Sequence, residues 1–251
     1  MKTKIKDGSV PSYITRLQGI EPVDIENEKS QFKFKSCVWG PFVMGIKLPM
    51  YFINELVERS QKNRTNDARP ALAGHLDKEH FYTPEDRDWF MSKMAKIFLA
   101  YRHSHEDHFD LHEYLPKDKD GNSIRFPMRF SLESLWINYM QPGEFNPTHN
   151  HSGDLSFVIF CQNPEWEDEI KQFVANSTPP GTLNFCMELS QRGDQKWKET
   201  NHPIFPEVGN MWIFPAELNH EVYPFKTPGV RISVSGNLRF TNKEDYPNRY
   251  W

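Results

Sequence analysis

The stretch Pro142-Gly-Glu-Phe-Asn-Pro-Thr-His149-Asn-His151-Ser-Gly-Asp154 lies between a turn and an apolar run. It contains two histidines one residue apart, and residues i and i+2 of an extended backbone point to the same face. Both imidazoles can therefore reach one point in space. The apolar run that follows, Leu155 to Cys161, predicts a buried strand that would hold them in place.

A third histidine, His220, follows a second apolar run from Met211 to Phe214. A neutral imidazole is the commonest metal ligand, and iron(II) suits imidazole and carboxylate together. Two sets of three ligands fit the pattern: His149, His151 and His220, or His149, Asp154 and His220. The first set is favoured, because His151 lies two residues after the first histidine, where a carboxylate would be expected.

Arg231 and Ser233 lie two residues apart in a β-branched run and share one face of a predicted strand. A guanidinium is a planar fork that matches a carboxylate in two parallel hydrogen bonds. The pair predicts a pocket for a dicarboxylate whose other end is free to chelate the metal. Tyr139 and Asn237, on candidate strands, are further candidates for this pocket.

From Ser131 onward, short apolar segments recur between Gly and Pro turn signals. Regular short strands of this kind predict a sandwich or barrel. The predicted strands are Leu135–Met140, Leu155–Cys161, Thr182–Met187, Met211–Phe214, Glu221–Phe225 and Val230–Phe240. Glu165–Val174 interrupts them as a charged loop or short helix.

Two helices are expected upstream of these strands. Apolar residues at helical spacing predict one over Pro49–Gln61. Thr83 is a suitable N-cap for the second, which should end near Arg102. Gln31–Ser36 alternates as a strand does. We expect one domain over residues 1–251, with N-terminal strands and supporting helices in 1–130 and the core that carries the metal site in 131–240.

Composition limits the classes of function. With 37% hydrophobic and 14% aromatic residues the chain can form a packed core, and a net charge of −4 without a long basic block indicates no nucleic-acid partner. Cys37, Cys161 and Cys186 form neither a zinc spacing nor a disulfide framework, which fits a reducing cytosol. The sequence shows no signal peptide and no membrane-spanning run, so we expect a cytoplasmic protein.

Two other segments suggest metal binding less strongly. Four histidines fall within His103–Tyr114, but no apolar strand frames them, so a solvated loop or short helix is the preferred interpretation. Lys117–Asn122 resembles part of a calcium loop. It lacks the closing glutamate, so Asp120 and Gly121 are predicted to form a hairpin turn.

Taken together, these residues resemble the iron(II)- and 2-oxoglutarate-dependent oxygenase superfamily, in particular its small members, many of them phage-encoded. Four blocks occur in the family's order, and the short segment Leu72–His75 is similar to a further one. The blocks are Leu135–Gly143, His149–Phe160, Gly209–Pro215 with His220 after it, and Arg231–Asn237.

The resemblance implies a mainly β fold with packed helices (α+β), a double-stranded β-helix or jelly roll, with Fe(II) and 2-oxoglutarate as cofactors. It implies that His149 and His220 bind iron, and that Arg231, assisted by Ser233, pairs with the distal carboxylate of 2-oxoglutarate. Oxidation of a second, unidentified substrate, a small molecule or a peptide, would release succinate and carbon dioxide.

The chain departs from the superfamily at His151, where most members have Asp or Glu. A neutral ligand there leaves the metal site one unit more positive. Two other functions therefore stay open: a cupin-like dioxygenase with a three-histidine iron site that does not use 2-oxoglutarate, and a jelly-roll binding protein without catalytic activity.

Overall fold

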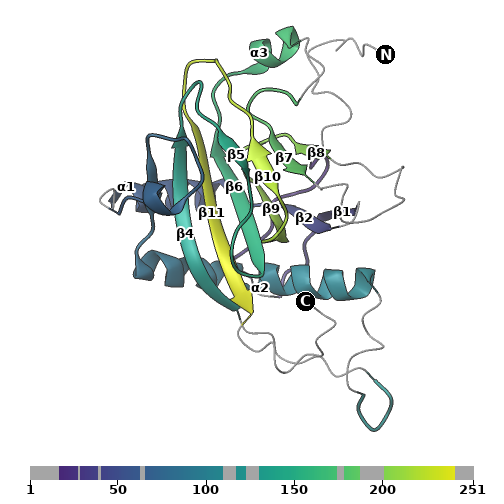
Figure 1. Ribbon diagram of the computed structural model, residues 1–251. Coiled ribbons are helices and arrows are strands. Elements are labelled where there is room, and N and C mark those ends of the chain that lie inside the picture. The colour runs from purple at the N-terminus through teal and green to yellow at the C-terminus, as the bar shows by residue number, and fades with distance from the viewer. Residues whose placement is uncertain are drawn as a thin grey trace, which may run out of the picture.

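The computed structural model describes residues 17–27, 29–38, 41–62, 66–109, 117–122, 130–173, 178–186 and 201–240, with only the backbone at 37 and 38. Two antiparallel sheets form its centre (Figure 1). The larger sheet has the order β1-β2-β9-β6-β11-β4-β3 and the smaller one the order β5-β10-β7-β8. The strands of the larger sheet are β1 (Lys35–Val38), β2 (Phe42–Lys47), β3 (Glu79–Phe81), β4 (Phe130–Met140), β6 (Leu155–Gln162), β9 (Asn210–Pro215) and β11 (Arg231–Phe240). Those of the smaller sheet are β5 (Asn146–His149), β7 (Leu183–Cys186), β8 (Asn201–Ile204) and β10 (His220–Val222).

The connections between the two sheets define the fold. From β4 to β11 the chain passes back and forth, so that β4, β6, β9 and β11 lie together in the larger sheet and β5, β7, β8 and β10 make up the smaller one. Eight strands wound in this way between two facing sheets form a jelly roll. The predicted fold class is confirmed.

Residue parity in β6 explains why the larger sheet is buried on both faces. Phe157 and Ile159 belong to a core cluster with the helices, whereas Val158 and Phe160 belong to a second cluster with the smaller sheet. Successive side chains of a strand point to opposite faces, so an unbroken apolar run fills two cores. The metal-site candidates lie on the side of the second cluster.

Two long helices, α1 (Met50–Lys62) and α2 (Pro84–His108), supply the other side of the first cluster. The rings of Phe90 in α2 and Phe157 in β6 stack with centroids 5.2 Å apart. The short α3 (Glu167–Gln172) lies where a charged loop or short helix was expected. None of the described helices is long and apolar enough to span a bilayer.

Helix α2 is longer than predicted. Thr83 caps it as expected, with its Oγ1 accepting a hydrogen bond from the Asp86 N–H at 3.2 Å. The helix continues past Arg102 because that residue pairs with Glu106 one turn later, at 2.9 Å, with both side chains buried. His103, His105 and His108 therefore lie in a helix, one of the two alternatives expected for this segment, and His112 lies outside the described residues.

Smaller differences concern the short elements. β1 begins at Lys35 rather than Gln31, and β3, β5 and β8 were not predicted as strands. The turn at Asp120 and Gly121 is present: Gly121 has φ +83° and its N–H donates to the Asp118 carbonyl at 3.1 Å.

Candidate active site

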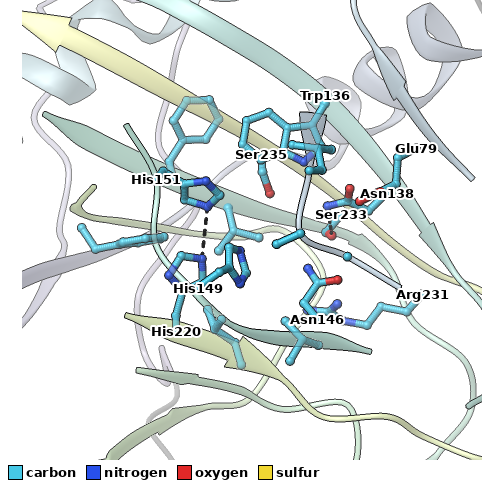
Figure 2. Close-up of a pocket in the computed structure, with 18 residues that line it drawn as sticks. Glu79, Trp136, Asn138, Asn146, His149, His151, His220, Arg231, Ser233 and Ser235 are labelled. Atoms are coloured by element: carbon cyan, nitrogen blue, oxygen red, sulfur yellow. Dashed lines mark hydrogen bonds between the residues drawn. The ribbon is translucent and has the colours of Figure 1, made fainter. Parts of the chain in front are cut away.

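Three histidines converge on one side of a cavity in the jelly roll (Figure 2). His149 ends β5, and the antiparallel pairing of β5 with β10 sets it directly opposite His220. His151 follows two residues later and is held by its N–H, which donates to the Ala216 carbonyl at 2.9 Å. One nitrogen of each imidazole lies within 4.8 Å of the others, so the three could hold a metal ion.

The hydrogen bonds of His149 and His220 engage Nδ1 and leave Nε2 of each ring free to bind a metal. His149 Nδ1 lies 2.7 Å from the Pro147 carbonyl, and His220 Nδ1 lies 2.9 Å from the Leu218 carbonyl. A carbonyl only accepts, so Nδ1 carries the proton in both rings and the Nε2 lone pair is free to coordinate. His151 Nε2 lies 3.2 Å from His220 Nε2, so the His151 nitrogen faces the same candidate metal position as the other two rings.

The imidazoles are neutral near pH 7. Burial lowers the pKa of His151 to about 4 and that of His220 well below its usual range, and the neighbouring histidines add to the effect. Burial also lowers the pKa of His149. Because a metal binds the neutral form of imidazole, this site fits a metal ion without first losing protons.

Asp154 does not join this cluster. Its carboxylate accepts a hydrogen bond from the Phe240 N–H at 2.8 Å, and its own N–H donates to the Leu238 carbonyl at 2.8 Å. Gly153, at φ +103°, turns the chain toward β11 just before it. The ligand set that contains Asp154 is therefore not assembled.

Arg231 lies in the same cavity as the histidines, which Ser233 also lines. The Arg231 side chain is buried between Met140, whose sulfur is 3.5 Å from Nη1, and the Phe160 ring. Its Nε has no hydrogen-bond partner among the described residues. Burial lowers its pKa to about 10, so it stays a cation at neutral pH and needs an anion that these residues do not supply.

The sequence of this region matches one protein family. Residues 134–237 match the model of the family described as "Putative 2OG-Fe(II) oxygenase". This span includes the three histidines, Arg231 and Ser233. The chain contains a 2OG-Fe(II) oxygenase domain. It is accordingly an enzyme, a non-haem iron oxygenase whose cofactors are Fe(II) and 2-oxoglutarate.

Several solved structures are similar to the oxygenase chain. A prolyl-4-hydroxylase from Pseudomonas putida is 19% identical, covers 78% of this chain and 91% of its own, and has a TM-score of 0.47. A viral collagen prolyl hydroxylase from Paramecium bursaria Chlorella virus-1, in its 2OG complex, is 12% identical over 79% and 96%, with a TM-score of 0.42. A Trichoplax adhaerens prolyl hydroxylase, in complex with a hypoxia-inducible-factor peptide, is 14% identical over 81% and 84%, with a TM-score of 0.42. A search of curated proteins finds no match.

Two of the predicted pocket residues of the oxygenase lie elsewhere. Tyr139 points to the helical side of β4, where its hydroxyl lies 2.8 Å from Ser60 Oγ. Asn237 is bound through its Oδ1 to Ser156 Oγ at 2.8 Å and does not line the cavity. The neighbour of Tyr139, Asn138, faces the cavity instead, and its Nδ2 lies 3.4 Å from Ser233 Oγ.

Sequence reasoning missed the segment that covers one side of the cavity. Leu72, Ala73 and Gly74 line it, and the segment is anchored just before β5 by the His75 N–H, which donates to the Phe145 carbonyl at 3.0 Å. The only signal for it was the similarity of Leu72–His75 to a short family segment. Glu79, in the same part of the chain, also lines the cavity and gave no signal at all.

Gly74 packs closely against polar side chains that line the cavity. A Cβ at this position would lie 2.6 Å from Asn146 Oδ1 and 3.0 Å from Glu79 Oε1. A side chain here would therefore push into the polar groups of the pocket. The close approach explains why this place suits a glycine.

Proposed function

We propose that His149, His151 and His220 hold Fe(II), that Arg231 and Ser233 bind the distal carboxylate of 2-oxoglutarate, and that the enzyme hydroxylates a second substrate with release of succinate and carbon dioxide. One observation carries the proposal: three neutral imidazoles and a buried cation share a single cavity. When bound, the iron and 2-oxoglutarate supply the oxidising chemistry.

The residues of the chain act by holding and orienting. The carbonyls of Pro147 and Leu218 fix the ring orientation of His149 and His220, so the coordinating nitrogens are in place before the metal binds. Arg231 places one end of 2-oxoglutarate, which leaves the 2-oxo acid end to reach the metal. The aromatic ring of Trp136, 5.5 Å from that of His151, closes the cavity on the side of β4.

The second substrate, which the enzyme oxidises, has to enter a narrow cavity. Leu72–Gly74 form part of the cavity wall, which supports a small molecule or a single protruding peptide side chain as the substrate. The described cysteines, Cys161 and Cys186, are free thiols, which supports a reducing compartment such as the cytoplasm.

Binding experiments with matched variants test the assignment. The wild-type chain should bind one Fe(II) or Mn(II) per molecule under anaerobic conditions, and His149→Ala and His220→Ala should lose it. Arg231→Ala should keep the metal and lose about a hundredfold in affinity for 2-oxoglutarate, because a buried charge-assisted pair is removed. Arg231→Lys should retain part of that affinity, since the charge remains.

The alternative of a dioxygenase that does not use 2-oxoglutarate is favoured by one feature, the absence of a carboxylate among the three clustered ligands. The same titrations separate the two. If Arg231→Ala and the wild type bind 2-oxoglutarate equally, or neither binds it at millimolar levels, the role of Arg231 proposed here is wrong.

A further inference from the structure

Glu79 is a buried acid in the cavity wall. It begins β3, at the edge of the larger sheet, and its side chain is almost fully buried. Strand pairing sets it opposite Asn138, which is itself opposite Ser233. The three side chains therefore form one row across β3, β4 and β11, and Figure 2 shows them together on the side of the cavity away from the histidines.

No described residue satisfies this acid. Its Oε2 is buried without a hydrogen-bond partner, and so is Asn138 Oδ1 beside it. Arg231 lines the same cavity, yet none of the described ion pairs joins it to Glu79. Buried polar groups without a partner carry a substantial free-energy penalty, so this end of the cavity is built for a polar ligand.

The surroundings of Glu79 favour its neutral form. Burial is the largest cause, the carboxylates of Glu144 and Asp67 add to it, and the Arg69 guanidinium opposes it, which together raise the Glu79 pKa to about 7. A neutral carboxyl group is a hydrogen-bond donor. The other titratable groups near or in the cavity are Arg231, His75, His80, His149, His151 and His220.

We propose that protonated Glu79 donates a hydrogen bond to the distal carboxylate of 2-oxoglutarate, beside Arg231 and Ser233, so that the cosubstrate binds together with one proton taken from solvent. The inference rests on the proposed function. Two carboxylates cannot both stay ionised at close range in a buried site, whereas an O–H···O⁻ hydrogen bond between them is strong. The proton stays on Glu79, and no covalent bond changes.

The sign of the pH effect follows. The competent form of Glu79 is protonated, so affinity is full below its pKa and falls as the pH rises through it. With a pKa of about 7, the affinity for 2-oxoglutarate should fall about tenfold between pH 6 and pH 8. The pKa of Arg231, about 10, lies above this window.

The first test compares wild type with Glu79→Gln. Gln keeps a hydrogen-bond donor of the same size and does not titrate. Calorimetric titration of 2-oxoglutarate into the Mn(II)-loaded wild-type enzyme should show the tenfold loss of affinity between pH 6 and pH 8. In E79Q the dissociation constant should change by less than about twofold over the same pH range. His75→Gln, which removes a histidine close to the cavity-lining segment and leaves Glu79 in place, serves as a control and should keep the wild-type slope.

The second test needs no variant. At pH 8, binding of 2-oxoglutarate should take up about 0.9 proton, measured from the binding heats in two buffers of different ionisation enthalpy, and at pH 6 only about 0.1. Tight binding to wild type with no proton uptake, or with the same pH slope in E79Q, overturns the role of Glu79 and leaves the proposed function standing. Failure of wild type to bind 2-oxoglutarate at any pH overturns both.

Discussion

Arg231 and Glu79 bring a cation and a carboxyl group that favours its neutral form into one cavity, without pairing with each other. Each is buried, and each is held by strands whose hydrogen bonds fix its position. A pair in contact would satisfy both groups and fill the site. Kept apart, the two groups leave a cavity that is prepared for a dicarboxylate, because the ligand supplies what each side chain lacks.

At the residue scale, Tyr139→Phe and Asn138→Ala should separate stability from binding. Tyr139→Phe removes the hydroxyl that bonds Ser60, and should lower the free energy of unfolding by about 1 kcal/mol with no change in affinity for 2-oxoglutarate. Asn138→Ala should weaken 2-oxoglutarate binding, since Asn138 lines the cavity beside Ser233. Urea unfolding measures the stability and calorimetric titration the affinity. Weaker 2-oxoglutarate binding in Tyr139→Phe together with unchanged binding in Asn138→Ala would show that Tyr139, and not Asn138, lines the pocket.

The histidines, Arg231 and Ser233 were predictable because their chemistry is visible in the spacing of the chain. Tyr139 was predicted for the pocket because the sequence indicates the strand but not which of its faces meets the cavity. Glu79 could not be found, since a charged residue in a polar segment normally indicates solvent exposure. The pairing of β3 with β4 and the packing of Gly74 bury it, and β4 lies about fifty residues further along the chain.

At the element scale, strands made of apolar runs were predicted well, whereas strands with a polar sequence were missed. β6 and β9 are nearly continuous runs of large apolar residues. β5 reads Asn-Pro-Thr-His and β8 reads Asn-His-Pro-Ile, and neither has the composition of a strand. These segments are extended because neighbouring strands pair with them, so tertiary structure overrides local preference.

The start of α2 makes a second prediction. Thr83→Ala removes both the bond from the Asp86 N–H and the one that Thr83 donates to the Asp86 carboxylate at 2.9 Å. The free energy of unfolding should fall by about 1 kcal/mol, and Thr83→Ser should restore most of it. Metal and 2-oxoglutarate binding should stay unchanged, because the cap lies on the helical side of the larger sheet. Equal stability of the two variants would contradict the role of the cap.

At the scale of the whole molecule, two cores share the larger sheet: the helices cover one face, and the smaller sheet with its metal-site histidines covers the other. The expectation that residues 1–251 form a single domain stays a prediction. The fold itself followed from the recurrence of short strands together with the family resemblance. The side on which the helices pack follows from residue parity, which becomes readable only once the strand partners are known.

Acid should destabilise the metal-free protein. Burial lowers the pKa of His105 and of His151 to about 4, and lowers those of His149 and His220, against about 6.5 in an unfolded chain. The unfolded state therefore binds more protons, and stability is lost as the pH falls from about 6.5 toward 4. Glu79 acts in the opposite direction, since its raised pKa favours the folded state as the pH falls from about 7, but it is one group against four.

Scanning calorimetry checks this prediction. The melting temperature of the metal-free chain should be lower at pH 5 than at pH 7. Mn(II) should raise the melting temperature more at pH 7 than at pH 5, because protons compete with the metal for the imidazoles. A metal-free protein that melts at a higher temperature in acid would show that the histidines are not buried as described.

The pairing of β5 with β10 has a further consequence. Because main-chain hydrogen bonds already hold His149 opposite His220, the spacing of the coordinating rings does not depend on the ion. Loading and unloading then need no refolding, and one divalent ion can replace another in the intact molecule. A cobalt(II) derivative, prepared by simple dialysis, would give the site a visible absorption spectrum through which occupancy could be followed directly.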